Sequence, residues 1–231
     1  MNPDQLALGP LWYVVFLLST TCHEAAHAWV AKLGGDLTAF HGGQVSLSPL
    51  PHIRREPFGM VLFPWLSYIS GGWMMGWASA PYDPAWSHRH PHRAARMALA
   101  GPGANLILAL LAGLGVRLGL ALGVFRAPEF VRFAHIVQPT SDGLAEAAAS
   151  LLSILFSLNI LLFAFNLLPV PPLDGWSAIG ILLPESGARK MEEFAQRFRA
   201  FSILGLVIAW QLFDRISTPI FTFAFRTLYG V

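Results

Sequence analysis

The chain has little charge, a single cysteine and no long hydrophilic stretch. Only 12% of its 231 residues are Asp, Glu, Lys or Arg, and the formal net charge is +2, so the sequence does not indicate a nucleic-acid surface. The lone Cys22 excludes an intrachain disulfide, and in its apolar surroundings we interpret it as an inert thiol. Because no hydrophilic segment is long enough for a separate soluble domain, we expect residues 1–231 to form one membrane-embedded domain.

Apolar residues dominate instead, and they recur in long uncharged runs. Hydrophobic side chains make up 55% of the chain, and its 8 Trp and 17 Phe suit lipid-facing and interfacial positions. Runs of this length predict an all-α polytopic protein with about four full spans, which we expect in the cell membrane of a prokaryote. The runs cover approximately residues 10–33, 57–79, 94–122, 147–168 and 201–225.

The first apolar run contains His23-Glu24-Ala25-Ala26-His27. Residues four apart lie on one face of a helix, so His23 and His27 can present ring nitrogens to one metal ion with Glu24 beside it. This pattern is typical of zinc hydrolases, in which the glutamate acts as a base. Because ionisable residues inside a span are costly and mark functional sites, we favour a zinc site over histidines satisfied by neighbouring helices.

The N-terminal segment differs from a removable signal peptide. It has no basic lead and no small-residue cleavage signal, and its apolar run carries the presumed metal ligands. We therefore expect it to be retained as the first span.

A zinc site needs a third protein ligand, and the spacings of soluble zinc proteases do not supply it. The residue six positions after His27 is Leu33, which excludes the family with a third histidine at that position. His41 and His52 are rival ligands. Both fall among turn residues, where a solvated histidine is the ordinary interpretation.

A remote candidate ligand follows the fourth apolar run, where three prolines precede Leu173-Asp174-Gly175. Prolines break a helix, and irregular backbone at membrane depth is tolerated only beside protein or a cavity. Asp174 either points into such a cavity and completes a His, His, Asp set, or is a loop aspartate that turns at Gly175. The spacing alone leaves both interpretations open.

The segment between the first two apolar runs contains β-prone pieces around Gly42-Gly43. These pieces predict a short β element near residues 37–50, as short strands or a hairpin. The next run, 57–79, contains Pro64 and the Gly71-Gly72 pair, which are suitable bends for a segment that enters the membrane and returns.

Three motifs together resemble the site-2 proteases, which are intramembrane zinc metalloproteases. The order of the motifs and their membrane setting extend the resemblance over most of the chain. The motifs are His23-Glu24-Ala25-Ala26-His27 in a span, Ala100-Gly101-Pro102-Gly103-Ala104-Asn105 opening a middle span, and residues 166–175 with the core Leu173-Asp174-Gly175.

The resemblance implies the roles of five residues. His23, His27 and Asp174 hold one Zn²⁺ ion, and Glu24 activates the water molecule bound to it. Asn105 matches a polar position near the family's site, where it orients the substrate strand or the polarised carbonyl. An interhelical hydrogen bond is the alternative interpretation of Asn105, because polar residues beside small ones often have this use in membranes.

Motifs that share one metal ion must lie at similar depth, which constrains the number of crossings. If residues 57–79 crossed the membrane fully, Asn105 and the segment that leads to Asp174 would lie near the membrane face opposite to the one near His23 and His27. If this segment dips in and returns, His23 and Asn105 each lie ~15 Å from the same side, by the helical rise per residue. We therefore predict that residues 57–79 form a re-entrant or hairpin segment.

The Lys and Arg residues give an independent measure of orientation. The re-entrant topology places ten of them on one side and four on the other, whereas a full crossing gives seven on each side. By the positive-inside rule, the larger group lies in the cytoplasm, and the active site opens toward it. The larger group is Lys32, Arg54, Arg55, Arg89, Arg93, Arg96, Arg189, Lys190, Arg197 and Arg199, and the smaller is Arg117, Arg126, Arg132 and Arg226.

Two further polar clusters are interpreted without catalytic chemistry. His88, His90 and His92 belong to a polar interfacial loop, whose alternative role is a second metal site. Gln211, Asp214 and Arg215 interrupt the last apolar run.

The sequence as a whole predicts an enzyme that hydrolyses a peptide bond within or next to a transmembrane segment of a membrane protein substrate. The expected partners are this substrate and the lipid bilayer. A zinc transporter and a non-catalytic scaffold that binds membrane helices are the competing functions. Convergence of the ligands at one depth, with Glu24 adjacent, favours hydrolysis. No pattern specifies the substrate, a regulatory partner or the oligomeric state.

Overall fold

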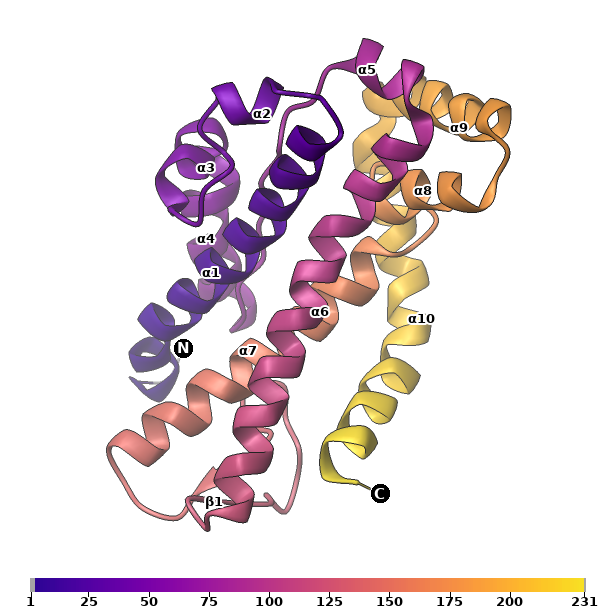
Figure 1. Cartoon of the computed structure of the whole chain (residues 1–231). Helices are drawn as coiled ribbons and strands as arrows, with labels where there is room; N and C mark the ends of the chain where they lie inside the picture. Colours follow the sequence, from indigo (N-terminus) through magenta and orange to yellow (C-terminus); the bar gives the residue numbers. More distant parts are fainter. Residues whose placement is uncertain (1–2, 231) are drawn as a thin grey trace.

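Four long helices form the frame of the molecule (Figure 1). They are α1 (Pro3–Leu33), α6 (Pro91–Ala121), α7 (Leu144–Asn166) and α10 (Ser202–Tyr229) in a computed structural model that describes residues 3–230. Each has at least 23 residues and an apolar stretch sufficient to cross a bilayer. The predicted all-α polytopic fold with about four full spans is confirmed.

Shorter elements connect these helices and cover one end of the bundle. In chain order they are α2 (Thr38–His41), α3 (Pro49–Arg55), the π-helical η1 (Phe58–Leu62), α4 (Phe63–Gly71), α5 (Pro84–Arg89), β1 (Phe125–Arg126), β2 (Gln138–Pro139), α8 (Asp174–Ala178), the 3₁₀ turn η2 (Ile179–Leu182), α9 (Glu185–Phe198) and the 3₁₀ turn η3 (Arg199–Phe201).

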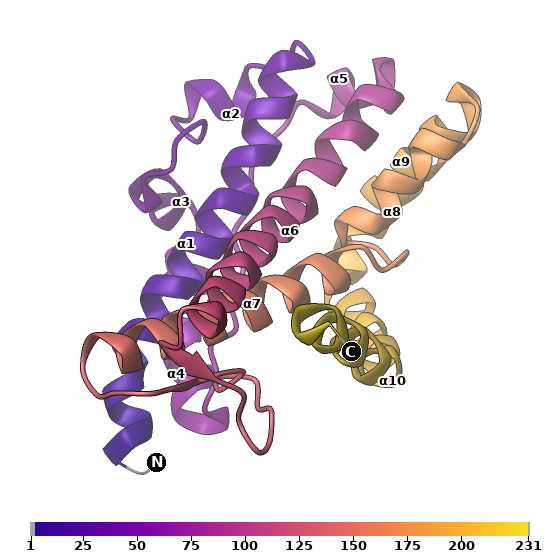
Figure 2. The same ribbon diagram turned by 60° about the horizontal axis from the view of Figure 1, so that its bottom comes forward.

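Helix α6 is the centre of the bundle, because it packs against both α1 and α7. Its buried face consists largely of small residues, including Ala98, Ala109 and Ala112. Small residues let membrane helices approach closely. The resulting dispersion contacts between helices stabilise the bundle against contacts with lipid. Figure 2 shows α10 on the other side of α7 from α1 and α4, and α10 is the least buried of the four long helices.

Residues 57–79 form a hairpin that enters the bundle and returns, as predicted. η1 and α4 form the inward arm, and an extended segment forms the outward arm. The backbone N–H of Trp77 donates to the carbonyl of Gly59 at 3.2 Å, and that of Met75 donates to the hydroxyl of Ser67 at 2.9 Å. Because the outward arm retraces the inward arm, this segment does not add a full crossing.

The short β element predicted near residues 37–50 is wrong. Residues 38–41 form the single helical turn α2, and the described chain from 42 to 48 is turn and irregular structure. The carboxylate of Asp36 accepts hydrogen bonds from the Thr38 N–H at 2.9 Å and from the Asp83 N–H at 2.9 Å, which favours a turn at this position. The Gln44 side chain is buried and donates to the carbonyl of Ser79 at 3.0 Å. The small antiparallel sheet is formed instead by β1 and β2.

Candidate functional site

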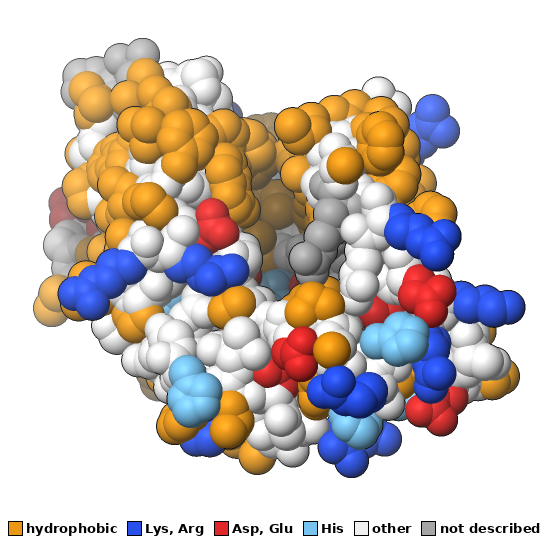
Figure 3. All heavy atoms as spheres, turned by 90° about the horizontal axis from the view of Figure 1, so that it is seen from above, with side chains coloured by type: hydrophobic (Ala, Val, Ile, Leu, Met, Phe, Trp, Pro, Cys, Tyr) orange, Lys and Arg blue, Asp and Glu red, His pale blue; other side chains and the backbone are white. Residues whose placement is uncertain are grey.

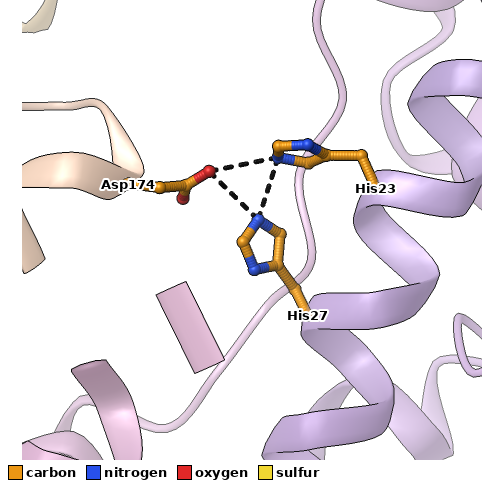
Figure 4. A group of neighbouring side chains, drawn as sticks. All are labelled: His23, His27 and Asp174. Atoms are coloured by element: carbon orange, nitrogen blue, oxygen red, sulfur yellow. Dashed lines mark hydrogen bonds and ion pairs between the residues drawn. The ribbon is translucent and has the colours of Figure 1, made fainter. Parts of the chain in front are cut away.

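Helix α1 presents His23 and His27 on one face, and both point toward Asp174 of α8 (Figure 4). The Nε2 atoms of His23 and His27 lie 3.1 Å and 3.3 Å from Asp174 Oδ2, and 3.0 Å from each other. Their ligand atoms all lie within 4.8 Å of one another, close enough to hold one metal ion. Two imidazole nitrogens and one carboxylate oxygen form a donor set that suits zinc and leaves a fourth position open.

Asp174 reaches this position because the chain leaves α7 and turns sharply. Three prolines between residues 169 and 172 prevent α7 from continuing, and α8 begins at Asp174. The following residue must be glycine, because a Cβ atom at Gly175 would lie 2.3 Å from the carbonyl oxygen of Leu167. The close approach of these two backbone segments directs the carboxylate toward α1.

Hydrogen bonds fix the rings of both histidines. His27 Nδ1 lies 2.7 Å from the carbonyl oxygen of Met97, which can only accept. His23 Nδ1 lies 2.6 Å from Asn105 Oδ1. If both Nδ1 atoms carry the proton, the two Nε2 atoms have free lone pairs directed at the ligand group.

Asn105 belongs to a fully buried polar network behind His23. Its side-chain NH₂ group donates to Asn159 Oδ1 at 2.8 Å and to the Ser19 carbonyl at 3.3 Å, and the Asn159 amide donates to the Ser19 hydroxyl at 2.9 Å. Ser19, Asn105 and Asn159 are each 0% exposed. The network links α1, α6 and α7, so Asn105 is placed to orient His23 and does not line the cavity described next.

A cavity of about 530 Å³ borders the ligand group. Glu24 is 7% exposed and lies on its wall together with both histidines and Asp174. The outward arm of the 57–79 hairpin and the first turns of α10 form other walls. Figure 3 looks onto the end of the molecule that carries α5 and α9, where charged and histidine side chains spread over the face beside a recess between its two halves. The remaining lining residues include Trp77, Ser79, Tyr82, Met97, Asn166, Glu192, Ser202 and Leu206.

The space beside the ligand nitrogens depends on a residue without a side chain. A Cβ atom at Gly101 of α6 would lie 2.3 Å from His27 Nε2 and 2.5 Å from His23 Nε2. Real contacts of this kind essentially never fall below 3.0 Å. The absence of a side chain at Gly101, together with the converging donors, makes these residues fit a zinc ion.

The rival histidines lie outside this group. His41 is exposed, and His52 is buried with its Nε2 3.2 Å from the carbonyl oxygen of Ser46. Within residues 3–230, the group formed by His23, His27 and Asp174 is the one set of three such side chains that could hold a metal.

The loop histidines have local partners. His88 Nε2 lies 3.0 Å from Glu193 Oε1, and His92 Nε2 lies 2.9 Å from the carbonyl oxygen of Leu183. His90 packs edge-on against Trp86. These contacts connect α5 to α9 and the first turn of α6 to Leu183, and the three histidines are directed at different partners.

Glu192 is a buried acidic residue of the cavity wall that the sequence did not indicate. It is 5% exposed, and its Oε1 accepts hydrogen bonds from Tyr82 at 3.0 Å, Ser87 at 3.1 Å and Gln196 at 3.2 Å. In the sequence, Glu192 lies in an amphipathic segment where charged residues normally face water. Only the packing of α9 onto α5 and α6 reveals that it is buried.

A His, His, Asp group with a buried glutamate beside it, inside a bundle of apolar helices, is the arrangement expected of a membrane metallopeptidase. The chain belongs to peptidase family M50, the site-2 protease family, whose model matches residues 11–209. It is therefore a zinc metallopeptidase and an integral membrane protein with bacterial relatives.

Two relatives support this assignment. The protein named "Putative zinc metalloprotease YwhC" of Bacillus subtilis (strain 168) is 34% identical over 189 residues, covering 81% of this chain and 76% of the relative. "Putative zinc metalloprotease Rip2" of Mycolicibacterium smegmatis is 30% identical over 164 residues, covering 71% of this chain and 54% of the relative. No solved structure gives a significant match.

Proposed function

We propose that this metallopeptidase cleaves a membrane protein substrate at a peptide bond within or next to a transmembrane segment. His23, His27 and Asp174 hold the zinc ion, Glu24 is the general base, and Asn105 is a positioning residue that acts through His23. The single observation that carries the proposal is the convergence of the three donors within 4.8 Å, beside a buried glutamate and between apolar helices.

The proposed chemistry divides between the metal and the protein. A bound zinc ion supplies a Lewis acid and makes water nucleophilic near neutral pH. The Glu24 carboxylate takes a proton from the attacking water as the new carbon–oxygen bond forms. When the carbon–nitrogen bond breaks, the same carboxyl group delivers that proton to the departing amine. The Met97 carbonyl and Asn105 hold the histidine rings in place throughout.

The position of the cavity supports a substrate that lies in the membrane. Several of its walls come from α1, α6, the end of α7 and the start of α10, which are parts of apolar helices long enough to span a bilayer. A helical substrate hides its backbone groups in internal hydrogen bonds, so it must unwind locally before a peptide bond is accessible. The cavity volume of about 530 Å³ is sufficient for a short unwound stretch of the substrate.

The proposal is tested by mapping new protein ends in membranes from cells that express the chain or its Glu24→Gln variant. The active chain is expected to generate ends within or next to transmembrane segments, and Glu24→Gln is expected to abolish them while keeping its zinc. Glu193→Gln is the matched control, because this partly exposed glutamate pairs with His88 outside the cavity. Active-chain membranes without such ends, or with ends only in soluble domains, would contradict the intramembrane assignment.

We further propose that the cavity opens toward the cytoplasm, on the basis of the ten-to-four bias of Lys and Arg. Single cysteines introduced at Ala85 and Asp142, after replacement of Cys22, test this orientation. Both positions are exposed. Ala85 belongs to α5, at the cavity end of the bundle, and Asp142 to the loop before α7, which begins at the opposite end (Figure 1). A membrane-impermeant thiol reagent added outside intact cells should label Asp142→Cys only. Labelling of Ala85→Cys instead would reverse the orientation.

A further inference from the structure

A second cavity, of about 800 Å³, lies in the half of the bundle opposite the metal group. One wall contains Trp12, which precedes His23 on α1 by ~16 Å of helix. Other walls are the tip of the 57–79 hairpin, the turn at residues 132–135 and residues 210–225 of α10. The proposed proteolytic mechanism makes no use of this space.

Two basic residues and one carboxylate line this cavity from different elements of the fold. Arg132 and His135 come from the turn, whose backbone is closed by hydrogen bonds of 3.2 Å and 2.9 Å between these two residues. Asp214 comes from α10. Among the described residues, none of the three side chains forms an ion pair, although all line the same cavity.

The turn that carries the basic residues is anchored by aromatic packing. The ring of Phe133 stacks on Trp12 at 5.8 Å between centroids and also contacts Phe221 of α10 at 5.7 Å. Arg132 and His135 are therefore held at the cavity by a fixed support rather than by a free loop tip.

Most of the remaining lining is apolar and aromatic. Trp73 and Trp210 stack at 5.7 Å, and Phe213 and Phe225 extend the surface along α10. Uncompensated charges near the hydrocarbon region are costly, so a ligand that meets both signs of charge is strongly favoured there. Such a ligand must also carry a long apolar part for the aromatic walls.

We propose that this cavity binds one phospholipid with a primary ammonium headgroup, from the leaflet opposite the metal group. Its phosphate contacts Arg132 and His135, its ammonium contacts Asp214, and an acyl chain lies along the aromatic walls. Guanidinium binds phosphate through paired hydrogen bonds, and a carboxylate accepts charged hydrogen bonds from a primary ammonium. A quaternary ammonium has no N–H to donate, and a glycerol headgroup has no positive charge.

The exposure of α10 favours a lipid as the occupant. Only 17% of its most apolar stretch is buried inside the protein, so most of this helix is left to contact lipid beside the cavity. A phospholipid joins both charges to an apolar chain in one molecule, which matches the distribution of charged and aromatic residues in this cavity.

The test is native mass spectrometry of the delipidated full chain with an equimolar mixture of dioleoyl phosphatidylethanolamine, phosphatidylcholine and phosphatidylglycerol. The unmodified chain should retain phosphatidylethanolamine about tenfold better than the other two, as expected for one additional charged hydrogen bond. Arg132→Gln should lower retention of all three lipids. Asp214→Asn should remove the preference for phosphatidylethanolamine over phosphatidylglycerol.

Arg126→Gln and Asp142→Asn are the matched controls, because both residues are exposed at the same end of the bundle and do not line the cavity. Both should behave like the unmodified chain, and the zinc content of every variant checks folding. Equal retention of the three lipids, or identical effects of Arg132→Gln and Arg126→Gln, would overturn the proposal. Displacement of phosphatidylethanolamine by an equimolar Leu-Ala transmembrane peptide of about 20 residues would overturn it in favour of a peptide site.

Discussion

Gly101→Ala is expected to weaken zinc binding by adding a single methyl group. The new Cβ atom would lie 2.3 Å from His27 Nε2, so one of them would have to move by about 0.7 Å to reach the 3.0 Å limit of real contacts. Zinc sites tolerate deviations of only about 0.2 Å in their ligand distances. Even outer-shell changes lower metal affinity by 10- to 100-fold, and we expect at least ~100-fold here.

Gly103→Ala is the matched control for this prediction. It lies two residues further along α6, and a Cβ atom there meets nothing within 4 Å. Alanine is favoured over glycine in a helix by about 1 kcal/mol, so neither substitution should weaken α6 itself. The assay is the zinc content of purified protein across a series of chelator concentrations. Equal zinc retention by Gly101→Ala and Gly103→Ala would refute the assignment of this space to the metal.

The remaining predictions concern the supports of the site. Asn105→Ala removes the acceptor for His23 Nδ1, and we expect zinc affinity to fall by about 10- to 100-fold, as measured by competition with a chelator; an unchanged affinity would exclude Asn105 as a positioning residue. Gly175→Ala forces the start of α8 away from the Leu167 carbonyl, so it should lower both zinc content and thermal stability, and normal values of both would contradict this packing argument. Glu192→Ala removes the acceptor of the buried Ser87 hydroxyl and of the partly buried Tyr82 and Gln196 donors, which should cost about 1–3 kcal/mol in unfolding free energy while zinc remains bound; loss of zinc instead would assign Glu192 to the metal site.

The sequence predicts the features of this protein that depend on local periodicity. Four spans follow from the length of the apolar runs, and the pairing of His23 with His27 follows from their spacing on one helix. The hairpin at residues 57–79 follows from the requirement that motifs sharing a metal have similar depth. Asp174 is separated from His27 by most of the chain, so its place beside the histidines depends on the resemblance to site-2 proteases.

Features that depend on distant contacts were not predicted. The segment at residues 37–50 has β-prone residues. However, the Asp36 carboxylate accepts a hydrogen bond from the Asp83 N–H, and the Gln44 side chain donates one to the Ser79 carbonyl. These distant contacts favour turns and one helical turn over strands. Likewise, Asn159 and Ser19 acquire their roles behind His23 only when α7 packs on α1. A polar residue within an apolar run is the available signal, and it does not identify the partner.

Zinc analysis of the purified chain beside its Asp174→Ala variant tests the central claim most directly. The unmodified protein should contain one zinc ion per chain, and Asp174→Ala should lose nearly all of it after gel filtration with a weak chelator, because two histidines alone hold zinc poorly. Asp142→Ala, which removes an exposed carboxylate from the loop before α7, should keep its zinc. Full zinc occupancy in Asp174→Ala would contradict a metal centre formed by His23, His27 and Asp174.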